Sequence, residues 1–175
     1  LSIRNVVLID KLDLDFHDGL SVLTGETGAG KSILLDSLGL ALGARADSGL
    51  VRHGCDKCSV TATFNLPQGH PVFRLLSDQD IDLEGEDLVV RRVVTADGRS
   101  RAYVNDQSVS VGLLRDVGNY CVEIQGQFDQ HGLLDPTTHR ATLDAHGNLG
   151  TLAMTVRDHW RAWRETQKEL NAARA

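Results

Sequence analysis

Eight consecutive residues near the N-terminus have the types and spacing that bind nucleotide phosphates. They read Gly25-Glu26-Thr27-Gly28-Ala29-Gly30-Lys31-Ser32, which matches the P-loop pattern G-x-x-x-x-G-K-S/T. The glycines let the backbone turn successive N–H groups toward an anion, and a helix beginning near Gly30 directs the positive end of its dipole to the same point. Lys31 is then expected to reach the β- and γ-phosphates, and Ser32 Oγ is expected to ligate Mg²⁺.

The residues on either side of this loop predict the strand–loop–helix order that a P-loop needs. Residues 20–24 are a short strand-like run, and residues 31–42 are a helix-like apolar run that ends at Gly43. Glycine is common just past a helix C-terminus. The alternative is a glycine-rich turn that precedes a helix without binding phosphate, and the intact order favours the P-loop.

The acidic residue that would complete a hydrolytic site does not stand out in the sequence. Such sites hold Mg²⁺ or orient water with an Asp or Glu at the end of an apolar strand. Residues 88–90 run into Arg91, and the short run at residues 120–122 runs into Glu123. Neither run fits the pattern, so we expect the site to be completed from outside these residues.

Four interpretations could supply the missing half. The chain could be the N-terminal half of a split head, a self-contained NTPase that uses Glu123, a nucleotide kinase, or a nucleotide-dependent interaction switch without hydrolysis. The hairpin-rich middle of the chain and its trailing helix disfavour the kinase. A split head makes sense of that trailing helix, because the two lobes of such ATPases are joined by a long antiparallel coiled coil.

The rest of the chain predicts an α/β fold with β-hairpins. Alternating apolar residues predict two strands in residues 2–16 with a turn near Asp10, and Asp97-Gly98 is a strong hairpin signal. Ser110 can cap a short helix. The further strands are predicted at residues 60–64, 86–95, 99–104 and 120–124, and the further helices at about 71–79, 110–118 and 136–146.

The last segment has a different pattern. Residues with spacings of three and four form an a/d heptad register with two polar intrusions, and the choice between a coiled coil and an ordinary amphipathic helix stays open. We expect an ATP-binding lobe at residues 1–147 and the start of an outgoing coiled-coil helix, cut within its length, at residues 148–175. The register consists of Leu149, Leu152, Val156, His159, Trp163, Thr166, Leu170 and Ala173.

Composition narrows the class of protein. The chain has 175 residues, of which 41% are hydrophobic, which suffices for one core, and no apolar stretch approaches a membrane span. The net charge of −6 argues against a nucleic-acid surface over the whole chain. It does not exclude a local one on the predicted hairpin, although solvated strand faces are the favoured interpretation there. The clustered cations are Arg91, Arg92, Arg99 and Arg101.

The cysteines indicate a reducing compartment rather than a disulfide framework. There are three, Cys55, Cys58 and Cys121, and an odd number fits the cytoplasm. Cys55 and Cys58 with His53 look like half a zinc site, but no second pair lies at the required distance. Small buried or turn cysteines are therefore expected.

Longer segments around these motifs resemble the RecN family, bacterial DNA-repair ATPases of the SMC-like group. The P-loop alone would indicate only an NTPase, whereas its extended string, together with the Gly-Arg-Ser-Arg segment and the Gly-Gln loop, is much more specific. One departure is Val6, where the family has an aromatic residue, so a role carried by that ring is in doubt. The matching segments are residues 3–5, 23–36, 43–47, 51–54, 98–105, 123–127 and 133–136.

The resemblance implies the N-terminal lobe of an ABC/SMC-type P-loop head with a mixed sheet. Two such heads would sandwich two ATP molecules, so the implied cofactors are ATP and Mg²⁺. The implied partners are the chain's own C-terminal head lobe, a second copy of the head, and DNA, at double-strand ends or single-stranded overhangs, with no membrane. The implied location is the cytoplasm, with association with the nucleoid on DNA damage.

The resemblance also implies further site residues. A glutamine in the loop after a central strand of such heads ligates Mg²⁺ and senses the γ-phosphate, and Gln127 is preferred here to Gln125. The nucleotide site would extend from the P-loop to Ile33, and Arg52 could point at the phosphates or form a structural ion pair. This lobe alone is expected to bind nucleotide weakly and to hydrolyse little.

Overall fold

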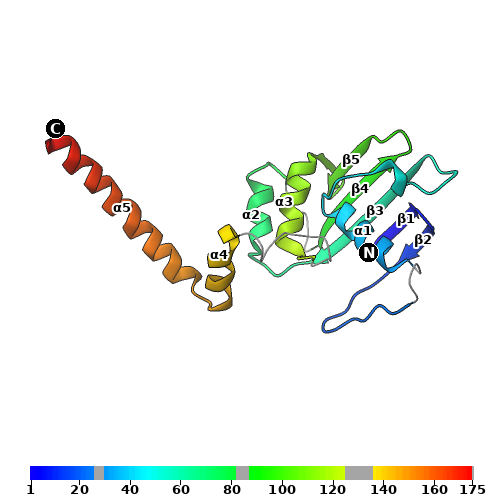
Figure 1. Ribbon diagram of the computed structural model, residues 1–175, viewed down its shortest axis with the longest axis horizontal. Helices are drawn as coiled ribbons and strands as arrows, with labels where there is room; N and C mark the ends of the chain where they lie inside the picture. Colours follow the sequence, from blue (N-terminus) through cyan, green and yellow to red (C-terminus); the bar gives the residue numbers. More distant parts are fainter. Residues whose placement is uncertain (26–29, 82–86, 125–135, 175) are drawn as a thin grey trace. The chain divides into compact units, whose positions relative to one another are not determined.

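The computed structural model describes residues 1–25, 30–81, 87–124 and 136–174 (Figure 1). They belong to two compact units, Leu1–Ile124 and Gln125–Ala175. In this described part of the chain, no helix has the length and apolarity that a membrane span requires. The functional division at residue 147 stays a prediction.

The first unit is built on a sheet whose described strands follow the order β2-β1-β3-β4-β5-β6, with every neighbouring pair antiparallel. The longest pairing joins β3 to β4 from Lys57 opposite Thr95 to Asn65 opposite Asp87. The predicted hairpin at Asp97-Gly98 is confirmed, with a positive φ of 83° at Gly98. The strands are β1 (Ser2–Val6), β2 (Ile9–Asp13), β3 (Lys57–Asn65), β4 (Asp87–Thr95), β5 (Ser100–Val104) and β6 (Gln107–Val109).

One face of this sheet carries the core, because successive side chains of a strand point to opposite faces. On β4, Leu88, Val90 and Val94 are fully buried. They pack in one core with apolar side chains of α1 (Lys31–Ala41), α2 (Pro71–Ser77) and α3 (Val111–Cys121). Each such side chain stabilises the fold by about 1.5–3 kcal/mol. Figure 1 shows α2 and α3 side by side at one end of the sheet.

Two glycines allow α3 to approach the end of α1 closely. A Cβ at Gly43 would lie 2.7 Å from the backbone N of Arg115, and one at Gly118 would lie 2.8 Å from the carbonyl O of Leu42. Gly43 also has a φ of 89°, and it follows the end of α1 as predicted. The predicted helices at 31–42, 71–79 and 110–118 are thus present, the last with its Ser110 cap.

Three local predictions are wrong. The turn between the first two strands lies at Val7 and Leu8 rather than near Asp10. Residues 20–24 form no strand, since this run has no sheet neighbour among the described residues and Leu20 is 92% exposed. The strand predicted at 120–124 is also wrong, because α3 continues through Gly118 to Cys121, with Gly118 serving as the contact point rather than as the helix end.

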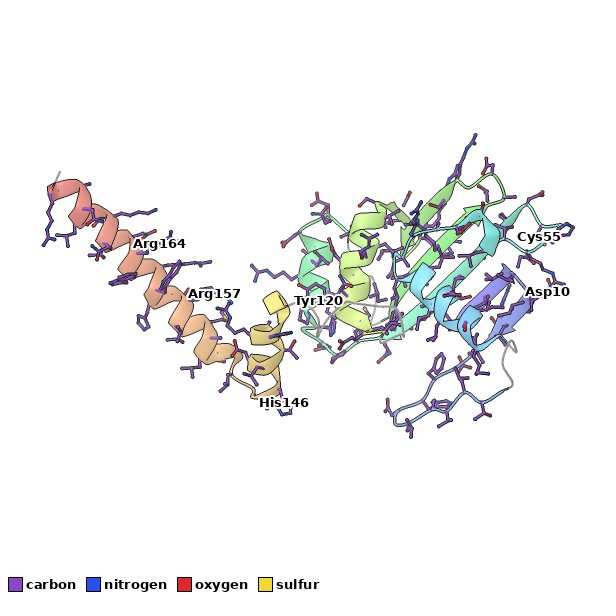
Figure 2. The ribbon with its side chains drawn as sticks, in the orientation of Figure 1. Asp10, Cys55, Tyr120, His146, Arg157 and Arg164 are labelled. Carbon is purple, nitrogen blue, oxygen red and sulfur yellow. The ribbon has the colours of Figure 1, made fainter. Side chains whose placement is uncertain are left out.

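The second unit contains two described helices, α4 (Pro136–His146) and α5 (Gly150–Arg174). Gly147 ends α4 as predicted, and Asn148 with a φ of 53° completes the turn between them. No residue of α5 is buried, and apolar side chains including Trp160 and Trp163 are exposed on it. Its arginines, such as Arg157 and Arg164, likewise extend from the helix (Figure 2).

Candidate nucleotide-binding site

The described ends of the P-loop have the backbone geometry of an anion site. Gly30 is the N-cap of α1 with φ 93° and ψ 3°, a left-handed conformation that glycine adopts without strain. Gly30 has no side chain to cap the helix, and the N-terminus of an α-helix is where backbone N–H groups can donate to an anion. The predicted residues Glu26, Thr27, Gly28 and Ala29 lie outside the described residues.

Lys31 and Ser32 begin the helix at this point. The Lys31 side chain is half-buried, and its Nζ donates a hydrogen bond to the carbonyl O of Gly25. Ser32 is exposed in the first turn of α1. The structure thus brings together Gly25, Gly30, Lys31 and Ser32, which are the described P-loop residues.

The rest of α1 holds this end of the helix in place. Ser37 and Leu40 are buried, and Ser37 Oγ donates to the carbonyl O of Ile33 over 2.6 Å. Ile33 itself packs against the core, so its side chain serves the fold. The opposite face of the helix, with Ser32, Leu35 and Asp36, is exposed.

Uncovered apolar side chains surround the loop in the sequence. Leu20 is 92% exposed, Val22 69%, Leu23 51% and Leu35, on α1, 50%. Three of these side chains precede the P-loop and the fourth lies one turn after it. Exposed aliphatic side chains are typical of surfaces that pack on a partner when they lie together.

The structure does not test the other residues that were predicted to contact the nucleotide. The half-buried Arg52 donates from NH1 to the carbonyl O of Leu8 over 3.2 Å, and its backbone N donates to the carbonyl O of Asn5 over 2.9 Å. These contacts hold Arg52 at the β1–β2 turn, and no ion pair joins Arg52 to another of the residues that the structure describes. Gln125 and Gln127 lie outside the described residues, and the roles of all three residues stay predictions.

The arginines of the predicted hairpin divide between the two faces of the sheet, a division that was not predicted from the sequence. Arg91 lies on the outer face, whereas Arg92 is only 2% exposed. Arg92 NH2 donates to Ser100 Oγ over 2.9 Å, while its Nε and NH1 have no hydrogen-bond partner in the described part of the chain. Burial, and then the neighbouring Arg115 cation, lower the pKa of Arg92. The signal was present, because Arg92 continues the alternation of Val90 and Val94.

The cysteines have structural positions. Cys58 is buried in the core, and Cys55 and Cys121 are partly buried. Burial raises the pKa of the Cys58 and Cys121 thiols, which keeps both protonated at neutral pH. In the described ranges, no group of three or more His, Cys, Asp or Glu side chains could hold a metal ion.

Comparison with known proteins gives one domain family and a set of relatives. A model of the AAA domain matches residues 1–132. The chain is 37% identical over 174 residues to the DNA repair protein RecN of Vibrio cholerae serotype O1, covering 99% of this chain and 31% of that protein. It is 41% identical over 144 residues to the DNA repair protein RecN of Bacillus subtilis, covering 82% and 25%. The chain therefore spans about a third or less of the length of these curated relatives.

Solved structures of SMC ATPase heads share the fold. One, described as the structural biochemistry of ATP-driven dimerization and DNA stimulated activation of SMC ATPases, has a TM-score of 0.56 and 21% identity, covering 82% of this chain and 95% of that one. An Smc head domain with an extended coiled coil, bound to the C-terminal domain of ScpA and derived from Pyrococcus furiosus, has a TM-score of 0.54 and 21% identity, covering 68% and 31%. The expected P-loop head fold is thereby confirmed.

Proposed function

The chain belongs to the AAA domain family, and from this premise we propose that it is the ATP-binding lobe of a RecN-like protein that acts in ATP-dependent DNA repair. The observation that carries the proposal is the P-loop itself, in which a left-handed Gly30 opens the N-terminus of α1 and Lys31 lies beside Gly25. The sequence similarity to RecN proteins, which extends over 99% and 82% of this chain for two of them, supports a role in DNA repair.

The described residues fit an ATP–Mg²⁺ ligand in charge and chemistry. Lys31 would exchange the carbonyl of Gly25 for the β- and γ-phosphate oxygens, and the first N–H groups of α1 would donate to the same anion. The exposed Ser32 hydroxyl is a hard oxygen ligand suited to Mg²⁺, and Gln127 is proposed as a second. Bound Mg²⁺ would neutralise charge on the phosphate oxygens. Lys31 would stabilise the charge that develops when water attacks the γ-phosphate.

We propose that the hydrolytic site is completed by the protein's C-terminal head lobe and by a second copy of the head. The sequence has no apolar run that leads into a convincing acidic residue, and Glu123 lies just after α3 rather than at the end of a strand. The exposed side chains of Leu20, Val22, Leu23 and Leu35 provide the apolar surface on which a further lobe would pack. This lobe alone would then bind ATP weakly and release little phosphate.

The exposed α5 supports a coiled-coil role. Leu149, Leu152, Val156 and Trp163 are between 43% and 61% exposed, as expected of a heptad stripe that lacks its partner helix. A 25-residue helix with no buried residue needs such a partner for most of its stability. We therefore propose that α5 begins an outgoing coiled coil.

DNA is the proposed target, at the ends or single-stranded overhangs of double-strand breaks, in recombinational repair in the cytoplasm at the nucleoid. This part of the proposal is supported by the RecN relatives, since the chain's net charge of −6 does not itself favour a polyanion. Binding of the full-length protein to duplexes with blunt and overhanging ends, measured across a salt series, tests it.

The nucleotide part is tested by ATP binding to the full-length protein with Mg²⁺ present. Lys31→Ala removes the charge-assisted hydrogen bonds to phosphate, and we expect ATP affinity to fall by about ten- to a hundredfold, the equivalent of about 1.5–3 kcal/mol. Lys11→Ala removes an exposed cation from β2 and serves as the matched control. Equal ATP affinity in the wild type and both variants would reject the site.

A further inference from the structure

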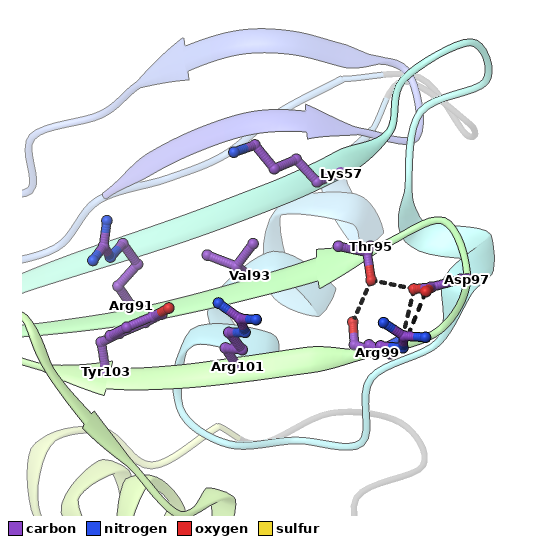
Figure 3. A pocket seen from close by; sticks show the side chains of 8 residues that line it. All are labelled: Lys57, Arg91, Val93, Thr95, Asp97, Arg99, Arg101 and Tyr103. Carbon is purple, nitrogen blue, oxygen red and sulfur yellow. Dashed lines mark hydrogen bonds and ion pairs between the residues drawn. The ribbon is translucent and has the colours of Figure 1, made fainter.

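A cluster of cations lines a hollow on the outer face of the sheet. The hollow has a volume of about 390 Å³, and its lining includes Lys57, Arg91, Arg99, Arg101 and Tyr103, from β3, β4, β5 and the turn that joins the last two (Figure 3). The only carboxylate among its lining residues is Asp97. Positive charge is thus concentrated here in a chain whose net charge is −6.

This hollow is separate from the nucleotide site. Val90, Val94 and Ala102 are buried on the face that α1 covers, so strand alternation places Arg91, Arg101 and Tyr103 on the opposite face. The P-loop leads into α1, which lies on the buried face of the sheet. The outer cations therefore cannot contact the same phosphates as Lys31.

The cations of the hollow differ in whether an ion pair with a carboxylate already neutralises their charge. Arg99 Nε lies 3.2 Å from Asp97 Oδ2, but the Arg99 side chain is 87% exposed. Hydrogen bonds from Thr95 and from the backbone N of Arg99 hold the pKa of Asp97 below its ordinary value, so this carboxylate is committed to the turn. Lys57 and Arg101 are exposed and have no ion-pair partner among the described residues.

Arg91 and Tyr103 form the floor at the other end of the hollow. The Arg91 guanidinium lies 4.5 Å from the centre of the Tyr103 ring, and its NH2 lies 3.0 Å from Asp106 Oδ1. Figure 3 shows the Arg101 side chain beside this pair. Because Arg91 already covers one face of the ring, stacking of Tyr103 on an unpaired base is disfavoured, whereas cations remain open to solvent along the hollow.

We propose that this outer-face hollow binds the phosphodiester backbone of DNA, without reading its sequence. Residues two apart on a strand lie about 7 Å apart and neighbouring strands about 4.8 Å apart, so the cations form a two-dimensional array that can meet several phosphates. Arginine forks suit phosphate oxygens, and backbone contacts carry no sequence information. The choice of DNA as the polyanion rests on the proposed function. The new element is the location of the DNA site on the outer face of the sheet.

The test measures binding of a short duplex DNA to the full-length protein over a series of salt concentrations. The variant carries Lys57→Gln, Arg99→Gln and Arg101→Gln, which leaves the Arg91–Tyr103 contact intact. The control carries Arg74→Gln, Arg140→Gln and Arg157→Gln, which removes the same charge from exposed helix positions. We expect the hollow variant to bind DNA at least tenfold more weakly, with a salt slope shallower by about 3, and to bind ATP like the wild type.

The outcomes separate the two proposals. If the wild type binds DNA and the hollow variant and control bind it equally well, the hollow is not the DNA site while the repair function stands. If the wild type binds no DNA, both the DNA target and the hollow are rejected. An equal loss in the control would show a net-charge effect and would also reject the hollow. Should the triple variant lose its cooperative thermal transition, Arg101→Gln alone is used, with an expected loss of about threefold.

Discussion

Lys31 Nζ donates a hydrogen bond to the carbonyl O of Gly25, which ties together the two described ends of the P-loop. The ammonium therefore lies beside the loop before any nucleotide binds. A ligand phosphate would replace a neutral carbonyl with an anionic acceptor, and charge-assisted hydrogen bonds are roughly twice as strong as neutral ones. The geometry thus prepares Lys31 for phosphate.

The contact of α3 with the end of α1 predicts opposite effects of two glycine substitutions in one helix. Gly118→Ala would place its Cβ 2.8 Å from the Leu42 carbonyl O, whereas a Cβ at Gly112 would meet nothing closer than 3.7 Å. We expect Gly118→Ala to lower the free energy of unfolding by about 1–3 kcal/mol through overpacking. Gly112→Ala should leave it unchanged or raise it by up to about 1 kcal/mol. Urea denaturation measures both, and an equally stable Gly118→Ala would contradict the close packing.

Because Arg92 is buried, we expect that its positive charge does not stabilise the lobe. Its Nε and NH1 have no hydrogen-bond partner among the described residues, so Arg92→Met removes a buried and only partly hydrogen-bonded cation while keeping most of the side-chain volume. We expect the free energy of unfolding of this chain to stay the same or to rise by about 1–4 kcal/mol. Ser100→Ala, which removes the one acceptor of NH2, should lower it by about 1–3 kcal/mol. Chemical denaturation measures both variants. If Arg92→Met lowers the free energy of unfolding and Ser100→Ala does not, this interpretation of Arg92 is wrong.

The buried thiol of Cys58 predicts a loss of stability at alkaline pH. Burial raises its folded-state pKa above the ordinary value of 9.0, so the folded protein holds this proton more tightly than the unfolded chain. This contribution is fully present below the unfolded pKa and is lost as the pH rises through the folded pKa. Cys58→Val lacks the titrating group, so its free energy of unfolding should fall less steeply above pH 9.0. Parallel pH profiles for the wild type and Cys58→Val would be the contrary result.

Substitutions in the exposed run before the P-loop should weaken association with the C-terminal lobe without impairing the folding of this chain. Leu20 and Val22 are 92% and 69% exposed, so replacing both with Ser should change the stability of this chain by no more than about 0.5 kcal/mol. If these side chains receive the C-terminal lobe, association with that lobe should weaken at least tenfold, as measured by calorimetry. Asp15→Ser with Asp18→Ser, at exposed positions upstream, is the matched control. Unimpaired association of the Leu20 and Val22 variant would place the lobe interface elsewhere.

The sequence was sufficient for several elements that a local signal determines. The P-loop helix, the Asp97-Gly98 hairpin and the Ser110 cap depend on residues close in the chain, and all are present. Predictions that need a distant neighbour were less successful. Residues 20–24 have the apolar alternation of a strand, but a strand also requires a paired strand beside it, which no described segment provides.

The same limit applied to the functional residues. Period-two alternation could have separated the buried Arg92 from the outer Arg91, but the clustering of charges in the sequence suggested solvated strand faces for all of them. The continuation of α3 through Gly118 depends on its contact with Leu42, which lies far away in the chain. The combination of Lys57 with Arg99 and Arg101 likewise depends on the pairing of three strands, which the linear sequence does not reveal.

Whether the nucleotide site is split between two lobes is tested by phosphate release from ATP, measured for this chain alone and after the remainder of the protein is supplied in trans. We expect little release by the chain alone, release in the mixture, and loss of that release when the chain carries Lys31→Ala. Robust Lys31-dependent release by the chain alone would contradict this expectation. The site would then be complete within these residues, and Glu123, exposed just after α3, would become the leading candidate for the missing acid.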